Sequence, residues 1–305
     1  KRFIKRIKIF IQSNCEGVEL KSILITGAKG FIGKNLIKEF NNKYKIYGLD
    51  RNNGDLKLKK KFPIVDIVIH LAAFNSTKDF YARPLQVIED NLIPTLNLLN
   101  FYKKQKTKPL FIYTGTPEIA AGATDSFNYK IPTDEKVPMI IEDIQNPRWS
   151  YASSKGLGEQ AIVSSGLKYI IIRPHNIYGP NQINHFFPEF IERCRKGKIV
   201  LNGWKNTRSW LYIDDCCDAI HKLMKCKKAI NQIVNIGSND ERKVIDVAKI
   251  ILKELKIKKN IIKNKAPKGS AKRRMPNITK LKKLTNWTPS TKLEDGIKKI
   301  IRLNR

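Results

Sequence analysis

The sequence predicts a doubly wound α/β fold, in which helices cover both faces of a parallel sheet, together with a smaller C-terminal lobe. Two observations carry this prediction. Strand-like apolar runs alternate with helical patterns through the first 180 residues, which is typical of parallel βαβ units. With 305 residues, the chain is long enough for one such domain and a second, smaller lobe.

The expected strands are short apolar runs that end in turn residues. They lie at 22–25, 45–49, 67–70, 110–113 and 169–172. We divide the chain into a basic N-terminal extension at 1–20, a main sheet domain at 21–180 and a lobe mainly at 181–305. Residues 230–240 are expected to return to the main sheet and complete it.

A glycine-rich turn joins the first expected strand to a helical pattern. Gly27 permits the tight turn, and Gly30 lets the backbone approach a pyrophosphate at the positive helix N-terminus. Gly33 allows the helix to pack closely on the strand. Taken alone, this turn also fits a plain loop.

The next strand ends in an acid, Asp50, about 20 residues after the glycines. A carboxylate there would accept hydrogen bonds from the ribose of adenosine and would repel a 2′-phosphate. The sequence therefore predicts NAD rather than NADP, while Arg51 directly afterwards keeps NADP as an alternative.

Tyr151 and Lys155 lie four residues apart, which places both side chains on one face of a helix. A free tyrosine is a poor base because its pKa is about 10, and a nearby ammonium favours the phenolate. The pair thus predicts a tyrosine base with a lowered pKa, although an exposed helical pair has the same spacing.

With these motifs the chain resembles the extended short-chain dehydrogenase/reductase family, in particular its NAD-dependent nucleotide-sugar epimerases and dehydratases. The resemblance runs from about Lys21 to Ile301. It depends on the order and spacing of eight short segments: 26–33, 66–73, 90–91, 114–118, 151–155, 173–180, 208–215 and 273–278. It implies a Rossmann-type fold and cofactor contacts from Gly27, Gly30, Phe31, Ile32, Gly33, Asp50, Arg51, Leu71, Ala72, Ala73, Asn91 and Lys155.

The resemblance also implies the catalytic residues. Tyr151 matches the base, Lys155 the residue that tunes it and holds the nicotinamide ribose, and Thr116 the hydroxyl that shares the substrate proton. Pro117 replaces the aspartate that protonates the leaving hydroxyl in 4,6-dehydratases, which disfavours dehydration. Glu118 matches an acid that decarboxylases share with many epimerases.

Substrate contacts are expected in the C-terminal lobe. Arginine forks match phosphate oxygens, so Arg208 and Arg274 (or Arg273) are the candidates for the substrate diphosphate. Exposed surface arginines are the alternative in so basic a chain. Further candidates are Asn176, which matches a family residue facing the sugar nucleotide, and His175 and His185, although a lone histidine is more often structural.

Together these residues predict a nucleotide-sugar C4 epimerase of polysaccharide biosynthesis that works through a 4-keto intermediate. The alternative enzyme is a decarboxylase or a 3,5-type epimerase that uses Glu118. A third possibility is an inactive family member that binds RNA, since a fold does not dictate activity. Intact Tyr151, Lys155 and Thr116 argue against it.

The composition sets the remaining expectations. The formal net charge is +32, but the lysines are dispersed and no nucleic-acid module is recognisable, so no specific nucleic-acid partner is expected. The basic and apolar segment at 1–11 could contact an anionic surface or be a packed extension. Five cysteines without metal-ligand spacing, and no apolar run of about 20 residues, predict a cytoplasmic protein without a metal. The family resemblance implies a homodimer through helices at 85–101 and 151–164.

Overall fold

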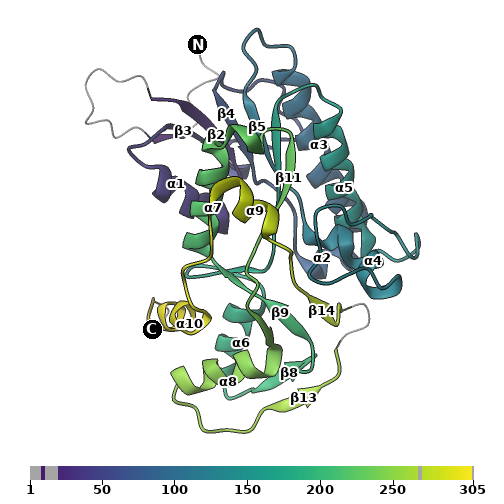
Figure 1. Cartoon of the computed structure of the whole chain (residues 1–305), viewed down its shortest axis with the longest axis vertical. Coiled ribbons are helices and arrows are strands. Elements are labelled where there is room, and N and C mark those ends of the chain that lie inside the picture. Colours follow the sequence, from purple (N-terminus) through teal and green to yellow (C-terminus); the bar gives the residue numbers. More distant parts are fainter. Residues whose placement is uncertain (1–7, 11–19, 267–269, 304–305) are drawn as a thin grey trace. The chain divides into compact units, whose positions relative to one another are not determined.

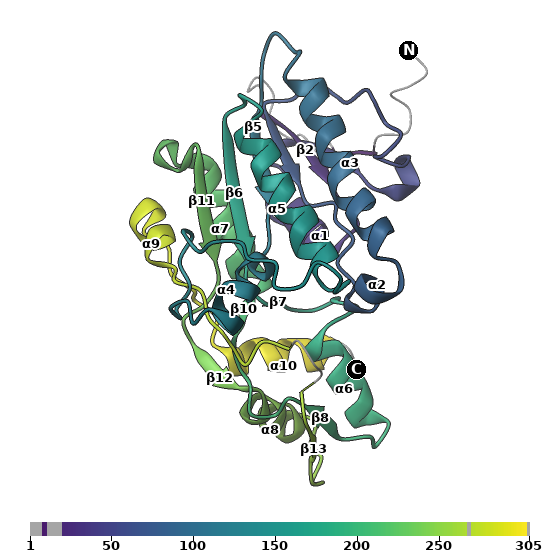
Figure 2. The same ribbon diagram turned by 90° about the vertical axis from the view of Figure 1, so that its right-hand side faces the viewer.

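The computed structural model describes residues 8–10, 20–266 and 270–303. The chain forms two compact units whose segments alternate along the sequence. Unit 1 comprises 1–119, 139–173 and 223–234, and unit 2 comprises 120–138, 174–222 and 235–305. Figures 1 and 2 show their elements from two directions.

Unit 1 is built on a seven-stranded sheet with the order β1-β3-β2-β4-β5-β6-β11. Its strands are β1 (Lys8–Phe10), β2 (Ser22–Thr26), β3 (Lys45–Leu49), β4 (Ile67–His70), β5 (Leu110–Thr114), β6 (Tyr169–Pro174) and β11 (Gln232–Ile236). Six strands are parallel, and β1 joins β3 antiparallel at the edge, with Lys8 opposite Gly48. The predicted Rossmann-type fold is confirmed.

Helices cover both faces of this sheet, as a doubly wound fold requires (Figures 1 and 2). On one face lie α3 (Pro84–Tyr102) and α5 (Trp149–Val163), which pack side by side. Their buried side chains join those of the strands in one core that includes Leu98, Ile162, Leu24 and Phe111. Helix α1 (Phe31–Phe40) lies on the opposite face, and the short α2 (Thr77–Ala82) precedes α3.

Strand β1 is the described part of the N-terminal extension. Of the two expectations for this extension, the edge strand that residues 8–10 add to the main sheet agrees with a packed extension. The anionic-surface contact predicted for residues 1–11 lies mostly outside the described residues. No described helix is long and apolar enough to cross a membrane.

Unit 2 contains short strands and five main helices. The strands form three small sheets: β7 (Ile177–Tyr178) with β10 (Leu211–Tyr212), β8 (Val200–Asn202) with β13 (Ile262–Asn264), and β12 (Glu241–Lys243) with β9 (Thr207–Ser209) and β14 (Arg273–Arg274). The helices are α6 (Phe186–Arg195), α7 (Ile213–Lys225), α8 (Val244–Glu254), α9 (Thr279–Thr285) and α10 (Leu293–Leu303), and the short α4 (Ala121–Ser126) comes earlier in the chain. Apolar residues at helical spacing bury one face of α10, with Leu293, Ile297 and Ile300 in the core.

Candidate active site and cofactor site

The glycines of the turn after β2 lie where a side chain would collide with nearby backbone. Gly27 has φ +70°, and a Cβ there would lie 2.9 Å from the backbone nitrogen of Ala72. A Cβ on Gly33 would clash with the carbonyl oxygen of Gly27. Gly30 is the N-cap of α1 and supplies no side-chain cap, so the first N–H groups of the helix can face an anion. This turn fits the pyrophosphate of a dinucleotide.

Asp50 lies beside this turn at the carboxyl end of β3. Its Oδ2 accepts a hydrogen bond from the backbone N–H of Lys29 at 2.8 Å, and its Oδ1 accepts one from Arg51 at 2.9 Å. The first bond links the acid to the turn, which is the arrangement that a ribose-binding carboxylate needs. The described residues thus bring the predicted phosphate and ribose groups together within unit 1.

Tyr151 lies in the first turn of α5, where three groups set the properties of its phenol. The ring stacks on Phe80, with 4.8 Å between ring centroids, and the Thr116 hydroxyl hydrogen-bonds to the phenol. The backbone N–H of Glu118 donates to the Thr116 hydroxyl at 3.2 Å. Burial raises the pKa of Tyr151 to about 12, Thr116 lowers it, and the Glu118 charge raises it.

This result corrects the expected effect of Lys155 on Tyr151. The sequence predicted that the ammonium would lower the pKa of Tyr151, but burial outweighs every neighbouring group. Lys155 is itself fully buried, with its Nζ 4.3 Å from the centroid of the Tyr113 ring. Burial lowers the pKa of Lys155 to about 7, although the charge of Glu159 raises it. With this pKa, Lys155 is about half protonated at neutral pH. Its charge is not among the causes that shift the pKa of Tyr151.

A buried ion pair next to this lysine escaped the sequence analysis. Arg173 donates from Nε to Glu159 Oε1 at 3.0 Å and from Nη2 to Oε2 at 2.6 Å, and both side chains are under 10% exposed. Gly115 makes room for the pair, since a Cβ there would clash with the Glu159 carboxylate. The signal was available, because Glu159 follows Lys155 by the same four residues that separate Lys155 from Tyr151.

Asn91, predicted to contact the cofactor, is bonded to helix α5 in this structure. Its Oδ1 accepts from the backbone N–H of Phe74 at 2.7 Å, and its Nδ2 donates to the hydroxyl of Ser154 at 3.1 Å. Ser154 in turn donates to the carbonyl of Tyr151 at 2.9 Å. The amide therefore ties the loop after β4 to the turn of α5 that carries Tyr151.

His70 continues this buried polar chain toward the glycine turn. Thr95 donates its hydroxyl proton to the Asn91 carbonyl at 2.9 Å, so it accepts from His70 Nε2 at 3.0 Å, and Nε2 carries the ring proton. In the neutral ring Nδ1 then accepts from the Thr26 hydroxyl at 2.6 Å, and Thr26 also accepts from the Ala72 N–H at 3.3 Å. Burial lowers the pKa of His70 to about 3, which matches this neutral tautomer.

The substrate candidates of unit 2 include a row of three arginines. Arg208 on β9 lies directly opposite Arg242 on β12 and Arg274 on β14. The guanidinium of Arg208 donates to the carbonyls of Thr207 and Ala271, both at 2.7 Å, while Arg242 pairs with Asp240 at 2.6 Å. Like charges in cross-strand positions repel each other, so this row favours an anion.

The other candidates of unit 2 have structural contacts. Asn176 has φ 43° and donates from Nδ2 to the Ser209 carbonyl at 2.8 Å. His175 is buried, and its backbone N–H donates to Ile236 at 2.8 Å. His185 is exposed at the start of α6. Among the described residues, no group of histidine, cysteine or acidic side chains could hold a metal ion.

A Rossmann-type sheet with a phosphate-type glycine turn and a Tyr–Lys pair on one helix defines a class of dinucleotide-dependent enzymes. Residues 23–237 match the NAD dependent epimerase/dehydratase family. The chain belongs to this family of nucleotide-sugar epimerases, dehydratases and decarboxylases, whose cofactor is NAD.

Curated relatives include both epimerases and decarboxylases. The chain is 30% identical to the bifunctional polymyxin resistance protein ArnA of Wigglesworthia glossinidia brevipalpis, over 98% of this chain but 53% of the relative. It is 29% identical to a UDP-N-acetyl-alpha-D-glucosaminuronate decarboxylase of Bacillus cytotoxicus and 29% identical to a putative UDP-glucose 4-epimerase of Methanocaldococcus jannaschii, each over 92% of this chain and 97% of the relative.

Solved structures of the family share the fold. The UDP-N-acetylglucosamine 4-epimerase of Methanobrevibacter ruminantium superposes with a TM-score of 0.82 at 20% identity, over 94% of this chain and 99% of that chain. At this identity the likeness concerns the fold.

Proposed function

We propose that this protein is an NAD-dependent nucleotide-sugar epimerase that inverts C4 through a 4-keto intermediate. The observation that carries the proposal is the hydrogen bond between Thr116 and Tyr151, with Pro117 as the next residue. Tyr151 is then a base for the sugar hydroxyl. Pro117 stands where an acid would be needed to protonate a leaving hydroxyl, so dehydration is disfavoured.

Tyr151 takes the proton of the 4-hydroxyl, and Thr116 shares that proton during the transfer. Bound NAD would supply the hydride chemistry at C4. Gly27, Gly30 and Gly33 would hold its pyrophosphate, Asp50 its adenosine ribose and Lys155 its nicotinamide ribose. The remaining predicted contacts, from Phe31, Ile32 and Leu71 to Ala73, follow the family resemblance.

With a pKa of about 12, Tyr151 is mostly the phenol at neutral pH, and the phenolate is the form that can accept the substrate proton. The Thr116 hydroxyl is the described group that favours the phenolate. We infer that the hydrogen bond from Thr116 to the phenolate makes this tyrosine a usable base. Lys155, with a pKa of about 7, is suited to hydrogen bonding with the ribose.

Nucleotide-sugar decarboxylation is the second candidate. The charge of Glu118 acts on the Tyr151 phenol, so this carboxylate lies near the proposed reaction centre. A decarboxylase is among the relatives that the chain matches along most of their length. In that reaction Glu118 would act on the substrate beside the base.

Arg208 and Arg274, two of the three arginines in the row, are proposed to bind the substrate diphosphate, since one guanidinium can donate two hydrogen bonds to phosphate oxygens. Asn176 and His175 are proposed contacts of the sugar nucleotide, and His185 is a weaker candidate because it is exposed.

A homodimer is proposed through α3 and α5. These helices expose the apolar side chains of Leu85, Leu96, Leu157 and Val163, the last on the final turn of α5. Unpartnered apolar residues on two adjacent helices are typical of a subunit interface. No specific nucleic-acid partner is proposed.

The test is product analysis with UDP-, GDP-, CDP- and dTDP-sugars, including a UDP-hexuronate. Nuclear magnetic resonance spectra of the products distinguish the reactions directly. A C4 epimer supports the proposal, and a pentose with release of CO₂ supports decarboxylation instead. A 4-keto-6-deoxy sugar would contradict both candidates.

A further inference from the structure

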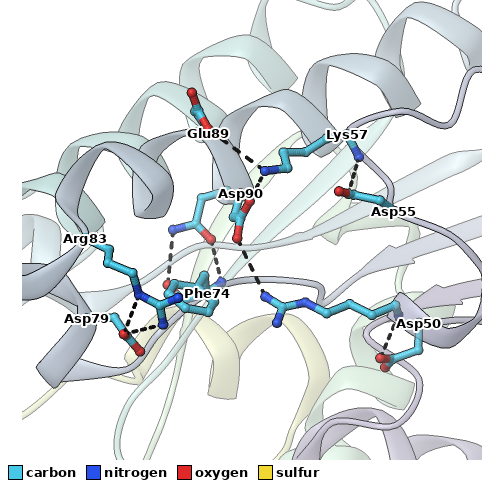
Figure 3. Close-up of polar contacts among 10 residues, drawn as sticks. Asp50, Asp55, Lys57, Phe74, Asp79, Arg83, Glu89 and Asp90 are labelled. Carbon is cyan, nitrogen blue, oxygen red and sulfur yellow. Dashed lines mark hydrogen bonds and ion pairs between the residues drawn. The ribbon is translucent and has the colours of Figure 1, made fainter.

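Phe74, in the loop after β4, lies between two guanidinium groups. The Cζ atoms of Arg51 and Arg83 each lie 5.2 Å from the centroid of its ring. Each arginine also has an acidic partner: Arg83 donates from Nε to Asp79 at 3.0 Å, and Arg51 Nη2 lies 3.6 Å from Asp90 Oδ2. Figure 3 shows Arg83 and Asp79 together beside Phe74, with Asp90 and Lys57 above them.

We call Phe74 with Arg51 and Arg83 the Phe74 clamp. The charged side chains around it are mostly acidic, whereas the chain as a whole is positively charged. Five carboxylates, from Asp50, Asp55, Asp79, Glu89 and Asp90, accompany three cations, Arg51, Lys57 and Arg83. Lys57 Nζ lies 2.6 Å from Asp90 Oδ1, and this hydrogen bond raises the pKa of Lys57. A net negative cluster within a chain of charge +32 is a local feature that a general excess of lysine does not produce.

Arg51 is the cation of this cluster that is best placed to meet the adenosine ribose. It follows Asp50 directly, and its backbone N–H donates to the Asp50 carboxylate at 2.9 Å. An arginine in this position could pair with the 2′-phosphate that distinguishes NADP from NAD. Its guanidinium instead contacts the Phe74 ring and Asp90.

We propose that Phe74 and Asp90 hold Arg51 away from the 2′-phosphate and so determine the preference of this enzyme for NAD. Asp50 repels the phosphate, and the contacts of Arg51 with Phe74 and Asp90 remove the cation that would offset this repulsion. The contact of Arg51 with Asp90 on α3 then excludes the binding of NADP through Arg51. The inference rests on the family's cofactor site and is independent of the sugar reaction.

The clamp provides its own matched control. Asp90→Asn and Asp79→Asn each remove one negative charge and the acidic partner of one arginine that contacts the Phe74 ring, but only Asp90→Asn releases Arg51. Asp90→Asn also frees Lys57, and the addition of Arg51→Gln separates the two effects. Isothermal titration calorimetry of the full-length variants with NAD, NADP, AMP and adenosine 2′,5′-bisphosphate measures binding without any turnover.

We expect Asp90→Asn to shift the affinity ratio about tenfold toward NADP and adenosine 2′,5′-bisphosphate, the scale of one added charged hydrogen bond. Asp79→Asn should leave the ratio unchanged. Adding Arg51→Gln to Asp90→Asn should cancel the shift, because the released guanidinium is then absent. Phe74→Leu keeps every carboxylate and removes the ring that contacts Arg51, so it should shift the ratio in the same direction. It tests the proposal independently if Asp90→Asn does not fold.

An equal shift in Asp79→Asn would overturn the proposal, because general charge would then explain it. So would a shift that persists in the double variant, or an unchanged ratio in both Asp90→Asn and Phe74→Leu. These outcomes do not depend on which sugar the enzyme converts, so the proposed function can fail while the cofactor inference holds.

Discussion

The Tyr151 face of α5 in unit 1 and the arginine row of unit 2 are assembled in different ways. Tyr151, Lys155 and Glu159 come from successive turns of one helix. The three arginines of the row come from strands 30 or more residues apart in the sequence, joined by antiparallel and parallel pairing. The helical set is encoded locally, whereas the arginine row exists only because distant strands align in register.

The surroundings of the two regions differ as well. Glu159 and Arg173 form a bidentate ion pair with side chains 8% and 6% exposed, and the similar pair of Glu241 and Arg273 is 19% and 48% exposed. Buried groups depend strongly on their partners, while solvent screens exposed ones. Variants should therefore have larger effects in unit 1 than in unit 2.

The largest effect is expected from Tyr151→Phe. Removing the base should lower kcat about 10³- to 10⁴-fold, near the upper end for general acid–base catalysis, with little change in NAD affinity. Turnover assays and calorimetry measure the two quantities. Tyr81→Phe on the neighbouring α2, half exposed, is the control and should be silent. Near wild-type turnover in Tyr151→Phe would exclude this residue as the base.

The next effect compares the two ion pairs. Glu159→Gln leaves Arg173 buried without its charge partner, which should lower the free energy of unfolding by about 3 kcal/mol. Glu241→Gln in the more exposed pair should cost about 1 kcal/mol or less. Urea denaturation of both variants measures the difference. Equal losses would show that burial does not separate the two regions.

A smaller effect is expected from Arg208→Ala. Loss of one guanidinium from the diphosphate site should raise KM about tenfold, which corresponds to about 1.4 kcal/mol. Arg242→Ala is the control, because this arginine lies opposite Arg208 but pairs with Asp240. If both variants raise KM equally, the effect comes from the charge of the sheet and not from a diphosphate contact.

The smallest effect concerns pH. The pKa of His70 is about 3 in the folded protein and about 6.5 when unfolded, so the unfolded chain binds more protons between these values. Stability should therefore fall as pH drops below 6.5, by about 1 kcal/mol between pH 6.5 and 5.5. His70→Gln should flatten this slope in urea denaturation. Parallel slopes for wild type and His70→Gln would contradict the buried neutral assignment.

Much of unit 1 could be predicted from sequence because its signals are local. Alternating strands and helices gave the parallel sheet, and the spacing of Tyr151 and Lys155 gave their shared helix. The pKa of Tyr151 could not be predicted, because it depends on burial and on the positions of Thr116 and Glu118, all set by tertiary packing. The spacing places Glu159 on the same helix face, but its role in an ion pair depends on Arg173, which tertiary packing brings beside it.

The substrate region was predicted less completely. Arg208 and Arg274 were candidates by resemblance, but their register with Arg242 depends on β9, β12 and β14, which are two or three residues long. Strands this short have almost no periodic signal. The clamp on Phe74 was also invisible, because Arg51, Arg83 and Asp90 meet through loops and the start of a helix.

The central claim is that Tyr151 starts a C4 inversion in which the hydride leaves the sugar and returns to the same carbon. The most direct measurement is the reaction of the identified substrate in D₂O, followed by mass and nuclear magnetic resonance spectrometry of the product. We predict a C4 epimer without carbon-bound deuterium, because no carbon exchanges its hydrogen with solvent. Deuterium at C5 of a decarboxylated or dehydrated product, or at C3 or C5 of an epimer, would contradict the account.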